Sequence, residues 1–320
     1  MRSARLELAL GSLDLPEGQI AVLRPRVGDD LSMLPKDRVV VVTGFLPDHA
    51  YFAAQGWRMA TECPEDAATV IVCLPRSKAH AHAMLERASH AELAIVDGQK
   101  TDGVESILKD LRKRGEVSDP VTKAHGKLFT FRAQVPEWAA KPTLVDGFQT
   151  MPGVFSADGP DRGSVLLAQS FPTLKGRVID LGAGWGYLAR HALDKGAKQV
   201  DLVEAEADAL ACARINVADA RARFHWADAT KFRPDQLAHH VICNAPFHTG
   251  RDADPRLGMA FVNAAAGMLV PDGVLWLVAN RHLPYREVLE TRFRKSEEIA
   301  GDSAFRVVRA EGPIRQRASG

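Results

Sequence analysis

The segment RVIDLGAGWGYLARHALDKGA, which begins at Arg177, constrains the fold of this chain more than any other. A short apolar run rich in β-branched residues leads into a glycine-rich turn, and a pattern with helical spacing follows the turn. A strand joined so tightly to a helix is typical of an α/β protein, in which helices pack back against a mostly parallel sheet. The segment therefore predicts a parallel sheet covered by helices.

The same alternation of strand and helix patterns runs through both halves of the chain. The first half has strand candidates at 37–44, 68–75 and 92–98, and its alternating run at 127–135 predicts a strand at an exposed edge. The second half repeats the rhythm, but only the second half has a glycine-rich turn between a strand and a helix. We therefore expect two tandem Rossmann-like α/β domains, of which the N-terminal one is degenerate.

The length of the chain also favours two domains. At 320 residues it exceeds the size at which a single hydrophobic core usually stops growing. Residues 136–164 are rich in proline and glycine and show no sustained period, which is typical of an inter-domain connection. We expect a first domain at 1–135 for RNA docking or structural support, a connection at 136–164, and a catalytic domain at 165–320.

The composition is that of an ordinary globular protein, with 46% hydrophobic residues, 25% charged residues and a formal net charge of +1. Near-neutrality neither suggests nor excludes a nucleic-acid partner. The four cysteines occur singly, without Cys-x-x-Cys spacing, and this pattern indicates reduced thiols rather than a disulfide framework or a zinc site. No apolar run approaches the roughly 18 residues of a membrane span. We expect a cytoplasmic protein without a metal or a membrane partner.

The glycine-rich turn is a candidate ligand site. Its glycines at alternate positions allow a tight turn and close approach of a ligand to the backbone: Gly182, Gly184 and Gly186. Asp180 precedes the turn, and Glu204 ends the next strand about twenty residues later, a position suited to a ribose diol. A strand-ending acid is often only a helix cap, but Glu206 can take that role and leave Glu204 free. A nicotinamide dehydrogenase would share these features.

Asp228, at the end of the third strand of the second half, favours a different nucleotide ligand. A carboxylate there can accept a hydrogen bond from an adenine amino group. The alternative is that Asp228 caps the segment that follows it.

The stretch VICNAPFHTG ends the fourth strand with residues suited to an aromatic amine. The Asn244 side-chain oxygen and a backbone carbonyl held by Pro246 can accept the two N–H groups, and Phe247 can stack on the ring. Two acceptors would aim the nitrogen lone pair at an electrophile, so orientation would carry most of the rate acceleration. The alternative is a structural turn with a core phenylalanine.

Taken together, these residues resemble the class I S-adenosylmethionine-dependent methyltransferases, and more narrowly the bacterial 16S ribosomal RNA guanine-N2 methyltransferases of the RsmC family. The resemblance covers most of residues 148–311 and is carried, in order, by PGVFSADGPDRGS, VIDLGAGWGYLA, NAPFHTG, VANRHLPY and FRVVRA. The first half resembles the family's degenerate methyltransferase-like domain more loosely, through VIVCLPRSK and LAIVDGQKTDGVES.

The resemblance implies a methyltransferase that uses S-adenosyl-L-methionine and modifies a guanine N2 amine during ribosomal RNA processing. It implies as cofactor-binding residues Gly182, Gly184, Gly186, Glu204 and Asp228, and we expect Asp180 and Asn244 to contact the cofactor as well. It implies as catalytic residues Asn244, Pro246 and Phe247, and we expect as further substrate contacts His248 and Arg281, although simple solvation is an alternative for these two. The expected partner is ribosomal RNA or the small ribosomal subunit, and we expect a monomer.

One residue departs from the pattern, because the family usually has Asn-Pro-Pro-Phe where this chain has Ala245 at the second position. Ala245 still precedes a proline and is biased toward an extended backbone, so the acceptor groups survive with less rigidity.

Four other functions are weighed against this one. They are guanine-N2 methylation of 23S RNA, protein glutamine methylation, a non-catalytic RNA-binding module, and a dinucleotide-dependent oxidoreductase. The intact glycine turn with both acids argues against a non-catalytic module, and an oxidoreductase has no use for NAPF.

Overall fold

The computed structural model describes residues 2–246 and 255–315. The chain forms two compact units, which are described separately. The N-terminal unit comprises Met1–Pro142 with Met151–Gly153, and the C-terminal unit comprises Thr143–Thr150 with Val154–Gly320. The division at Pro142 falls inside the connection that we expected at 136–164.

The C-terminal unit is built on a seven-stranded sheet in the order β13-β12-β11-β14-β15-β17-β16. Strands β11 to β15 pair in parallel, and β17 pairs antiparallel with both β15 and β16. A small hairpin, β9 with β10, precedes the sheet. The strands are β9 (Thr143–Val145), β10 (Phe148–Thr150), β11 (Gly176–Leu181), β12 (Ala197–Glu204), β13 (Ala222–Trp226), β14 (Ala238–Asn244), β15 (Leu269–Asn280), β16 (Phe293–Gly301) and β17 (Phe305–Pro313).

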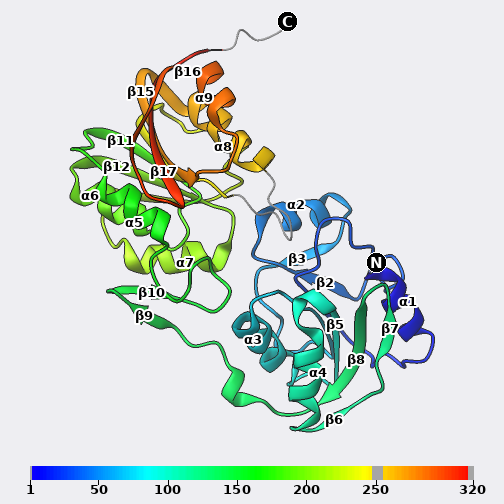
Figure 1. Ribbon diagram of the computed structural model, residues 1–320. Helices are drawn as coiled ribbons and strands as arrows, with labels where there is room; N and C mark the ends of the chain where they lie inside the picture. Colours follow the sequence, from blue (N-terminus) through cyan, green and yellow to red (C-terminus); the bar gives the residue numbers. More distant parts are fainter. Residues whose placement is uncertain (1, 247–254, 316–320) are drawn as a thin grey trace, which may run out of the picture. The chain divides into compact units, whose positions relative to one another are not determined.

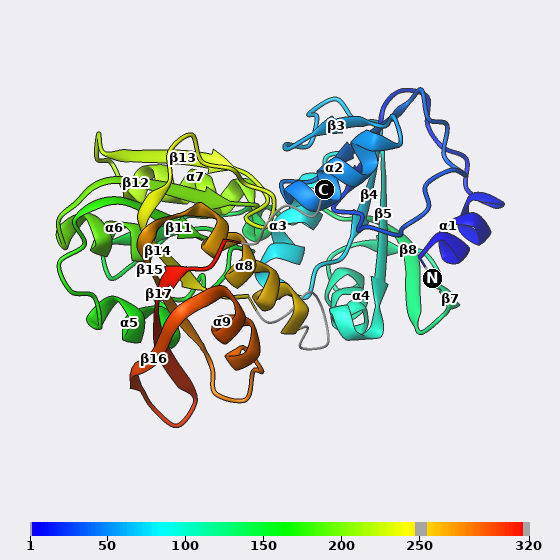
Figure 2. The ribbon, with the colours of Figure 1, turned by 90° about the horizontal axis from the view of Figure 1, so that it is seen from above.

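Helices cover both faces of this sheet (Figures 1 and 2). Successive strand residues point to opposite faces, so Val178 and Ile242 pack with one helix layer, whereas Ile179 and Val241 pack with the other. The first layer consists of α5 (Arg162–Gln169), α6 (Tyr187–Asp194) and α7 (Ala207–Asn216), and the second of α8 (Pro255–Met268) and α9 (Arg286–Arg292).

The N-terminal unit contains a second mixed sheet, in the order β3-β2-β1-β4-β5-β8-β6, with β7 also paired to β8. Its strands are β1 (Ile20–Leu23), β2 (Val39–Val42), β3 (Arg58–Ala60), β4 (Thr69–Cys73), β5 (Leu93–Gln99), β6 (Glu116–Val117), β7 (Val121–Lys123) and β8 (Gly126–Arg132). Its helices are α1 (Ser3–Leu10), α2 (Leu46–Ala54), α3 (Lys78–Ala88) and α4 (Val104–Arg112), with 3-10 turns η1 (Lys100–Asp102) and η2 (Pro136–Trp138). Helices α3 and α4 pack on one face, and α1 and α2 on the other.

The α/β fold with mixed sheets is confirmed, but several elements differ from the prediction. The alternating run around Phe129 is not an edge strand, because β8 pairs with β5 on one side and with β6 and β7 on the other. Strand β1 lies at the centre of the N-terminal sheet and was not predicted at all. The Pro-Asp-Gly sequence at 271–273, which is typical of the end of a helix, instead belongs to β15, where the pairing with β14 shifts register.

No helix in the described part of the chain is long and apolar enough to cross a membrane. The cysteines are unpaired thiols, and all except the half-buried Cys63 are buried.

Candidate active site

Three strand ends meet at one edge of the C-terminal sheet. The central strand β11 lies between β12 and β14, so their carboxyl ends are neighbours. Asp180 and the glycine turn lie at the end of β11, Glu204 ends β12 and Asn244 ends β14. Ligands of open α/β sheets bind at the carboxyl ends of the strands. The fold therefore brings together the core of the predicted site.

The three glycines of the turn all adopt positive φ, at 74° for Gly182, 54° for Gly184 and 91° for Gly186. Their surroundings differ. A Cβ at Gly186 would lie 2.7 Å from Val217, and one at Gly182 would lie 3.3 Å from the Phe261 ring. A Cβ at Gly184 would meet nothing within 4 Å. Gly182 and Gly186 therefore allow close packing, whereas Gly184 borders open space that a ligand can occupy.

The Glu204 carboxylate holds this turn in place. Its Oε2 accepts a hydrogen bond from the Gly184 N–H at 2.8 Å, and its Oε1 accepts one from the Glu206 N–H at 2.7 Å. The expectation that Glu206 caps the next helix is wrong, because its side chain makes no capping hydrogen bond to α7. An ionised carboxylate offers about four acceptor sites, so Glu204 can still accept hydroxyl groups from a ligand.

Asp180 is a buried acid beneath the turn. Neither carboxyl oxygen makes a hydrogen bond of normal geometry within the described residues. Burial, and then the charge of Glu204, raise the pKa of Asp180 from 3.8 to about 8, although the Ala189 backbone N–H favours the charged form. Burial raises the pKa of Glu204 as well. The two acids therefore form a site that favours a proton, a cation or hydrogen-bond donors.

Asp228 lies in the turn after β13 and is engaged with that turn. Its Oδ1 accepts hydrogen bonds from the Thr230 N–H at 2.9 Å and the Thr230 hydroxyl at 2.6 Å. Its Oδ2 lies 3.5 Å from the ammonium of the exposed Lys231. This is the capping arrangement that we weighed as the alternative, and a contact to adenine stays a prediction that would use Oδ2.

Asn244 is held by two side chains that the sequence analysis missed. Its Nδ2 donates to Asp161 Oδ2 at 2.8 Å and to Ser164 Oγ at 2.9 Å. Asp161 is also the N-cap of α5, because its Oδ2 accepts the Ser164 N–H at 3.0 Å. The signal available in the sequence was an aspartate directly before a helical pattern. That signal predicts a cap, but it does not predict a contact with a residue 83 positions away.

Pro246 and Arg281 come just after the strands β14 and β15. Pro246 is separated from Asn244 by Ala245, whereas Phe247 and His248 lie outside the described residues. The Ala245 N–H donates to the Val278 carbonyl at 3.4 Å, a bond that a proline at this position could not make. Arg281 follows β15 at the same sheet edge, and its guanidinium contacts Glu298 Oε1 at 2.6 Å and the Asp302 carbonyl.

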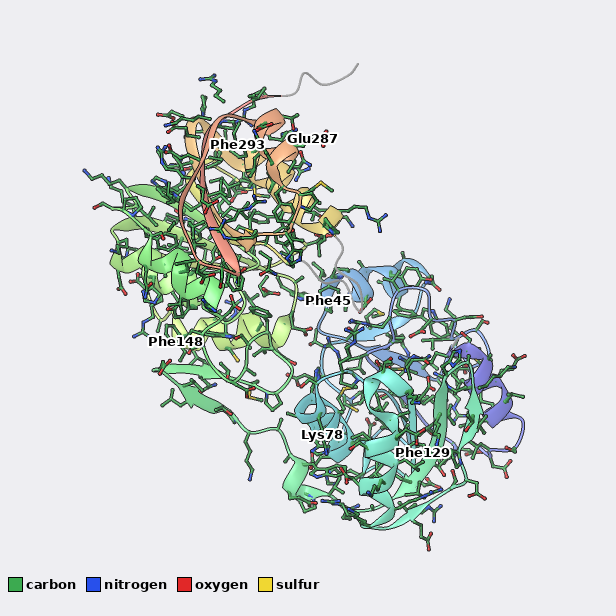
Figure 3. The ribbon with its side chains drawn as sticks, in the orientation of Figure 1. Phe45, Lys78, Phe129, Phe148, Glu287 and Phe293 are labelled. Carbon is green, nitrogen blue, oxygen red and sulfur yellow. The ribbon has the colours of Figure 1, made fainter. Side chains whose placement is uncertain are left out.

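Aromatic and amide groups of β10 and α7 pack against the glycine turn and support it. The Trp185 indole N–H donates to the Phe155 carbonyl at 2.9 Å, and the Trp185 carbonyl accepts from Asn216 Nδ2 at 2.8 Å. Asn216 also exchanges hydrogen bonds with the Gln149 backbone. The ring of Phe148, a residue labelled in Figure 3, has its centroid 5.1 Å from that of Trp185. These contacts fix the turn between the β10 strand and α7, and no sequence motif indicated them.

Among the described residues, no group of three or more His, Cys, Asp or Glu side chains is arranged to hold a metal ion.

The raised pKa of Asp180 predicts how stability depends on pH. The folded protein holds this proton up to about pH 8, whereas the unfolded carboxyl loses it near 3.8. This contribution to stability is therefore complete below the unfolded pKa and is lost as the pH rises toward the folded pKa, by up to about 1.4 kcal/mol per pH unit. We expect Asp180→Asn to lose less stability than the wild type between about pH 5 and pH 8. Scanning calorimetry of both proteins at several pH values checks this, and parallel stability curves would contradict it.

Comparison with known proteins identifies the family of this chain. Residues 147–309 match the family described as the methyltransferase small domain. The ribosomal RNA small subunit methyltransferase C of Hamiltonella defensa is 31% identical over 263 residues, covering 76% of this chain and 76% of the relative. The enzyme of the same name from Hahella chejuensis is 31% identical over 242 residues, covering 69% of each chain.

A solved structure extends the likeness to the whole fold. The 16S ribosomal RNA guanine-N2 methyltransferase (RsmC) of T. thermophilus, determined with AdoMet and guanosine, matches with a TM-score of 0.79 at 24% identity and covers 97% of this chain and 92% of its own. The chain therefore belongs to the methyltransferase small domain family, as a member of its ribosomal RNA small subunit methyltransferase C group.

Proposed function

We propose that the C-terminal unit transfers a methyl group from S-adenosylmethionine to the exocyclic N2 amine of a guanine in 16S ribosomal RNA. The observation that carries the proposal is the position of Asn244. Its amide lies at the carboxyl end of β14, next to the glycine turn on β11, and its nitrogen is bonded to the protein. The oxygen of the same planar amide points away from those bonds, as an acceptor for a substrate amine requires.

The residues of the turn suit the proposed cofactor. Bound S-adenosylmethionine would supply an electrophilic methyl group on a cationic sulfonium. The open space at Gly184 would admit the cofactor, the free acceptor sites of Glu204 would bind its ribose, and Asp228 Oδ2 would approach its adenine amino group. The buried Asp180 carboxyl, which makes no hydrogen bond of normal geometry within the described residues, would favour a cationic ligand nearby.

At the target guanine, the residues of the chain would orient the N2 amine, and no base would be needed to deprotonate it. The Asn244 side-chain oxygen and a backbone carbonyl held by Pro246 would accept hydrogen bonds from the two N–H groups of the amine. That arrangement aims the nitrogen lone pair at the methyl group, and the proton leaves after the nitrogen has become cationic. Phe247 would stack on the guanine, a contact worth about 1–3 kcal/mol. His248 and Arg281 would contact the RNA, and Arg281 would exchange its bond to Glu298 for one to a phosphate.

The choice of the small subunit rests on the relatives. The relatives named above are called small-subunit enzymes, and the solved relative is called a guanine-N2 methyltransferase. These names favour 16S over 23S RNA as the substrate. We place the activity in the cytoplasm, on ribosomal RNA or the small subunit, with the protein acting as a monomer.

We further propose that the N-terminal unit is a degenerate copy of the C-terminal one. The two sheets share their strand order, and Leu23 at the end of β1 pairs with Val42 and Val72 as Leu181 at the end of β11 pairs with Val203 and Cys243. In this register, Asp180, Glu204 and Asn244 of the C-terminal unit correspond in turn to Val22, Thr43 and Cys73 of the N-terminal unit. None of these three side chains carries a carboxylate or an amide. The N-terminal unit would then support folding or RNA docking, for which α4 offers the exposed Lys109, Arg112 and Lys113.

Gly184→Asp tests the cofactor site. We expect this substitution to abolish binding of S-adenosylhomocysteine, because the side chain enters open space beside Glu204 and adds a like charge. Gly147→Asp is the matched control, since Gly147 also has positive φ and open surroundings but lies in the β9–β10 turn. Calorimetric titration of the wild type should give one site per chain. Residual binding of one equivalent by folded Gly184→Asp would show that the N-terminal unit, or another site, holds the cofactor.

Asn244→Ala tests the proposed catalytic role. Loss of one acceptor that acts mainly in the transition state should slow single-turnover methylation by about 10²–10³-fold, by analogy with oxyanion-hole deletions. Affinity for the RNA should stay nearly constant, because phosphate contacts supply most of it. The assay uses unmethylated 16S RNA or small subunits with saturating S-adenosylmethionine. An unchanged rate would make NAPF a structural turn.

A further inference from the structure

Within the described residues, the Asn244 amide is hydrogen-bonded through its nitrogen only, and the groups that accept these bonds belong to the first turn of α5. We infer that Asp161 and Ser164 are positioning residues, which select the amide orientation that presents oxygen rather than nitrogen to the target amine. The inference rests on the proposed function, and it concerns residues to which that function assigns no role.

The donor and acceptor count supports this selection. An asparagine amide has two N–H donors, and here both point to the protein, one to Asp161 Oδ2 and one to Ser164 Oγ. An ionised carboxylate only accepts hydrogen bonds, so a flipped amide would place the Asn244 oxygen against the Asp161 oxygen at about the 2.8 Å now spanned by the hydrogen bond. The Ser164 hydroxyl can donate or accept, and it would tolerate either orientation. Asp161 is therefore the residue that discriminates between the two.

The orientation matters because the two ends of the amide have nearly the same shape and opposite chemistry. A flipped Asn244 would present two N–H donors to an amine whose own N–H groups need acceptors. The amine would lose a hydrogen bond, and its lone pair would no longer be aimed. The charge on Asp161 also strengthens the bond that it accepts and polarises the amide, which makes the opposite oxygen a better acceptor.

The local sequence Asp-Arg-Gly-Ser at 161–164 builds this support. Asp161 is fixed as the N-cap of α5 by the Ser164 N–H. Gly163 leaves room for it, because a Cβ there would lie 3.0 Å from Asp161 Oδ2 and 3.1 Å from the Phe305 ring. Ser164 is buried, and α5 packs against β14 and β15. The cap, the close approach and the hydroxyl thus come from three residues of a single helical turn.

This arrangement predicts that Asn244→Asp fails, although it keeps an acceptor oxygen of the same size. The new carboxylate would face the Asp161 carboxylate across the present hydrogen bond. The double variant Asp161→Asn with Asn244→Asp removes one of the two facing carboxylates, and the new amide at position 161 can donate to residue 244 where it turns away from the Ser164 N–H. It leaves the second oxygen of residue 244 turned toward the target.

The experiment measures single-turnover methylation of 16S RNA at saturating S-adenosylmethionine, together with affinity for S-adenosylhomocysteine and thermal stability. Asp161→Asn keeps the helix cap while its oxygen stays against the Ser164 N–H, and it removes the charge that strengthens the bond from Asn244 and polarises the amide. We expect it to slow methylation by about 10–100-fold, by analogy with groups that orient the ligands of a metal ion, with little change in stability or cofactor affinity. Ser164→Ala should slow it less. The double variant should be at least about ten times faster than Asn244→Asp alone, a non-additivity that direct contact produces.

Ser77→Ala is the control for stability loss alone. Ser77 caps α3 of the N-terminal unit through the His80 N–H, so its removal should lower stability without slowing the single-turnover rate.

Each outcome decides one claim. A wild-type rate for Asp161→Asn, or a double variant no faster than Asn244→Asp, would overturn the inference while leaving the proposed function intact. If Asp161→Asn were poorly folded, Ser164→Ala and the comparison of Asn244→Asp with the double variant would still decide. A wild-type protein that bound S-adenosylhomocysteine but methylated no 16S guanine would overturn the proposed function, and the inference with it.

Discussion

The hydrogen bond from the Gly184 N–H to the Glu204 carboxylate is the interaction on which the candidate site depends. It joins the glycine turn after β11 to the end of β12. The backbone of Gly184, which has a positive φ, and the carboxylate of Glu204 are therefore adjacent at the edge of the sheet. Burial, and after it the charge of Glu204, raise the pKa of Asp180, which explains why these neighbouring acids favour a proton or a cation. Trp185 and Asn216 then brace the turn against the rest of the unit. A ligand therefore meets a preformed surface, which lowers the cost of binding.

Contacts between neighbouring elements also fix Asn244, the residue that would face the target amine. Strand β14 delivers Asn244 to the sheet edge, and the first turn of α5 fixes its amide. Capping a helix and orienting a side chain use one carboxylate oxygen, Asp161 Oδ2, which accepts from both Ser164 N–H and Asn244 Nδ2. A group with two structural partners has few alternative rotamers, and a rigid acceptor is what an orientation mechanism needs.

The sequence predicts those parts of the molecule whose signals are local. The glycine turn, the acid that ends β12 and the amide that ends β14 were all visible within short stretches, and so was the alternation of strands and helices. Strand β1 was missed because its four residues, Ile20 to Leu23, are too few to establish a period. The edge assignment of β8 failed because alternation reports exposure of one face, whereas β6 and β7 cover its edge. The contact of Asp161 with Asn244 depends on packing between distant segments, which no local pattern encodes. Roles for Phe247, His248 and Arg281 stay predictions.

The central claim is guanine-N2 methylation of small-subunit RNA, and product identification tests it most directly. Purified protein would be incubated with unmethylated small and large ribosomal subunits and isotopically labelled S-adenosylmethionine, and the nucleosides of each RNA would be analysed by mass spectrometry. The account predicts one labelled N2-methylguanosine in 16S RNA, lost in Asn244→Ala, and none in 23S RNA. Label on 23S RNA, on another base or on protein would contradict it.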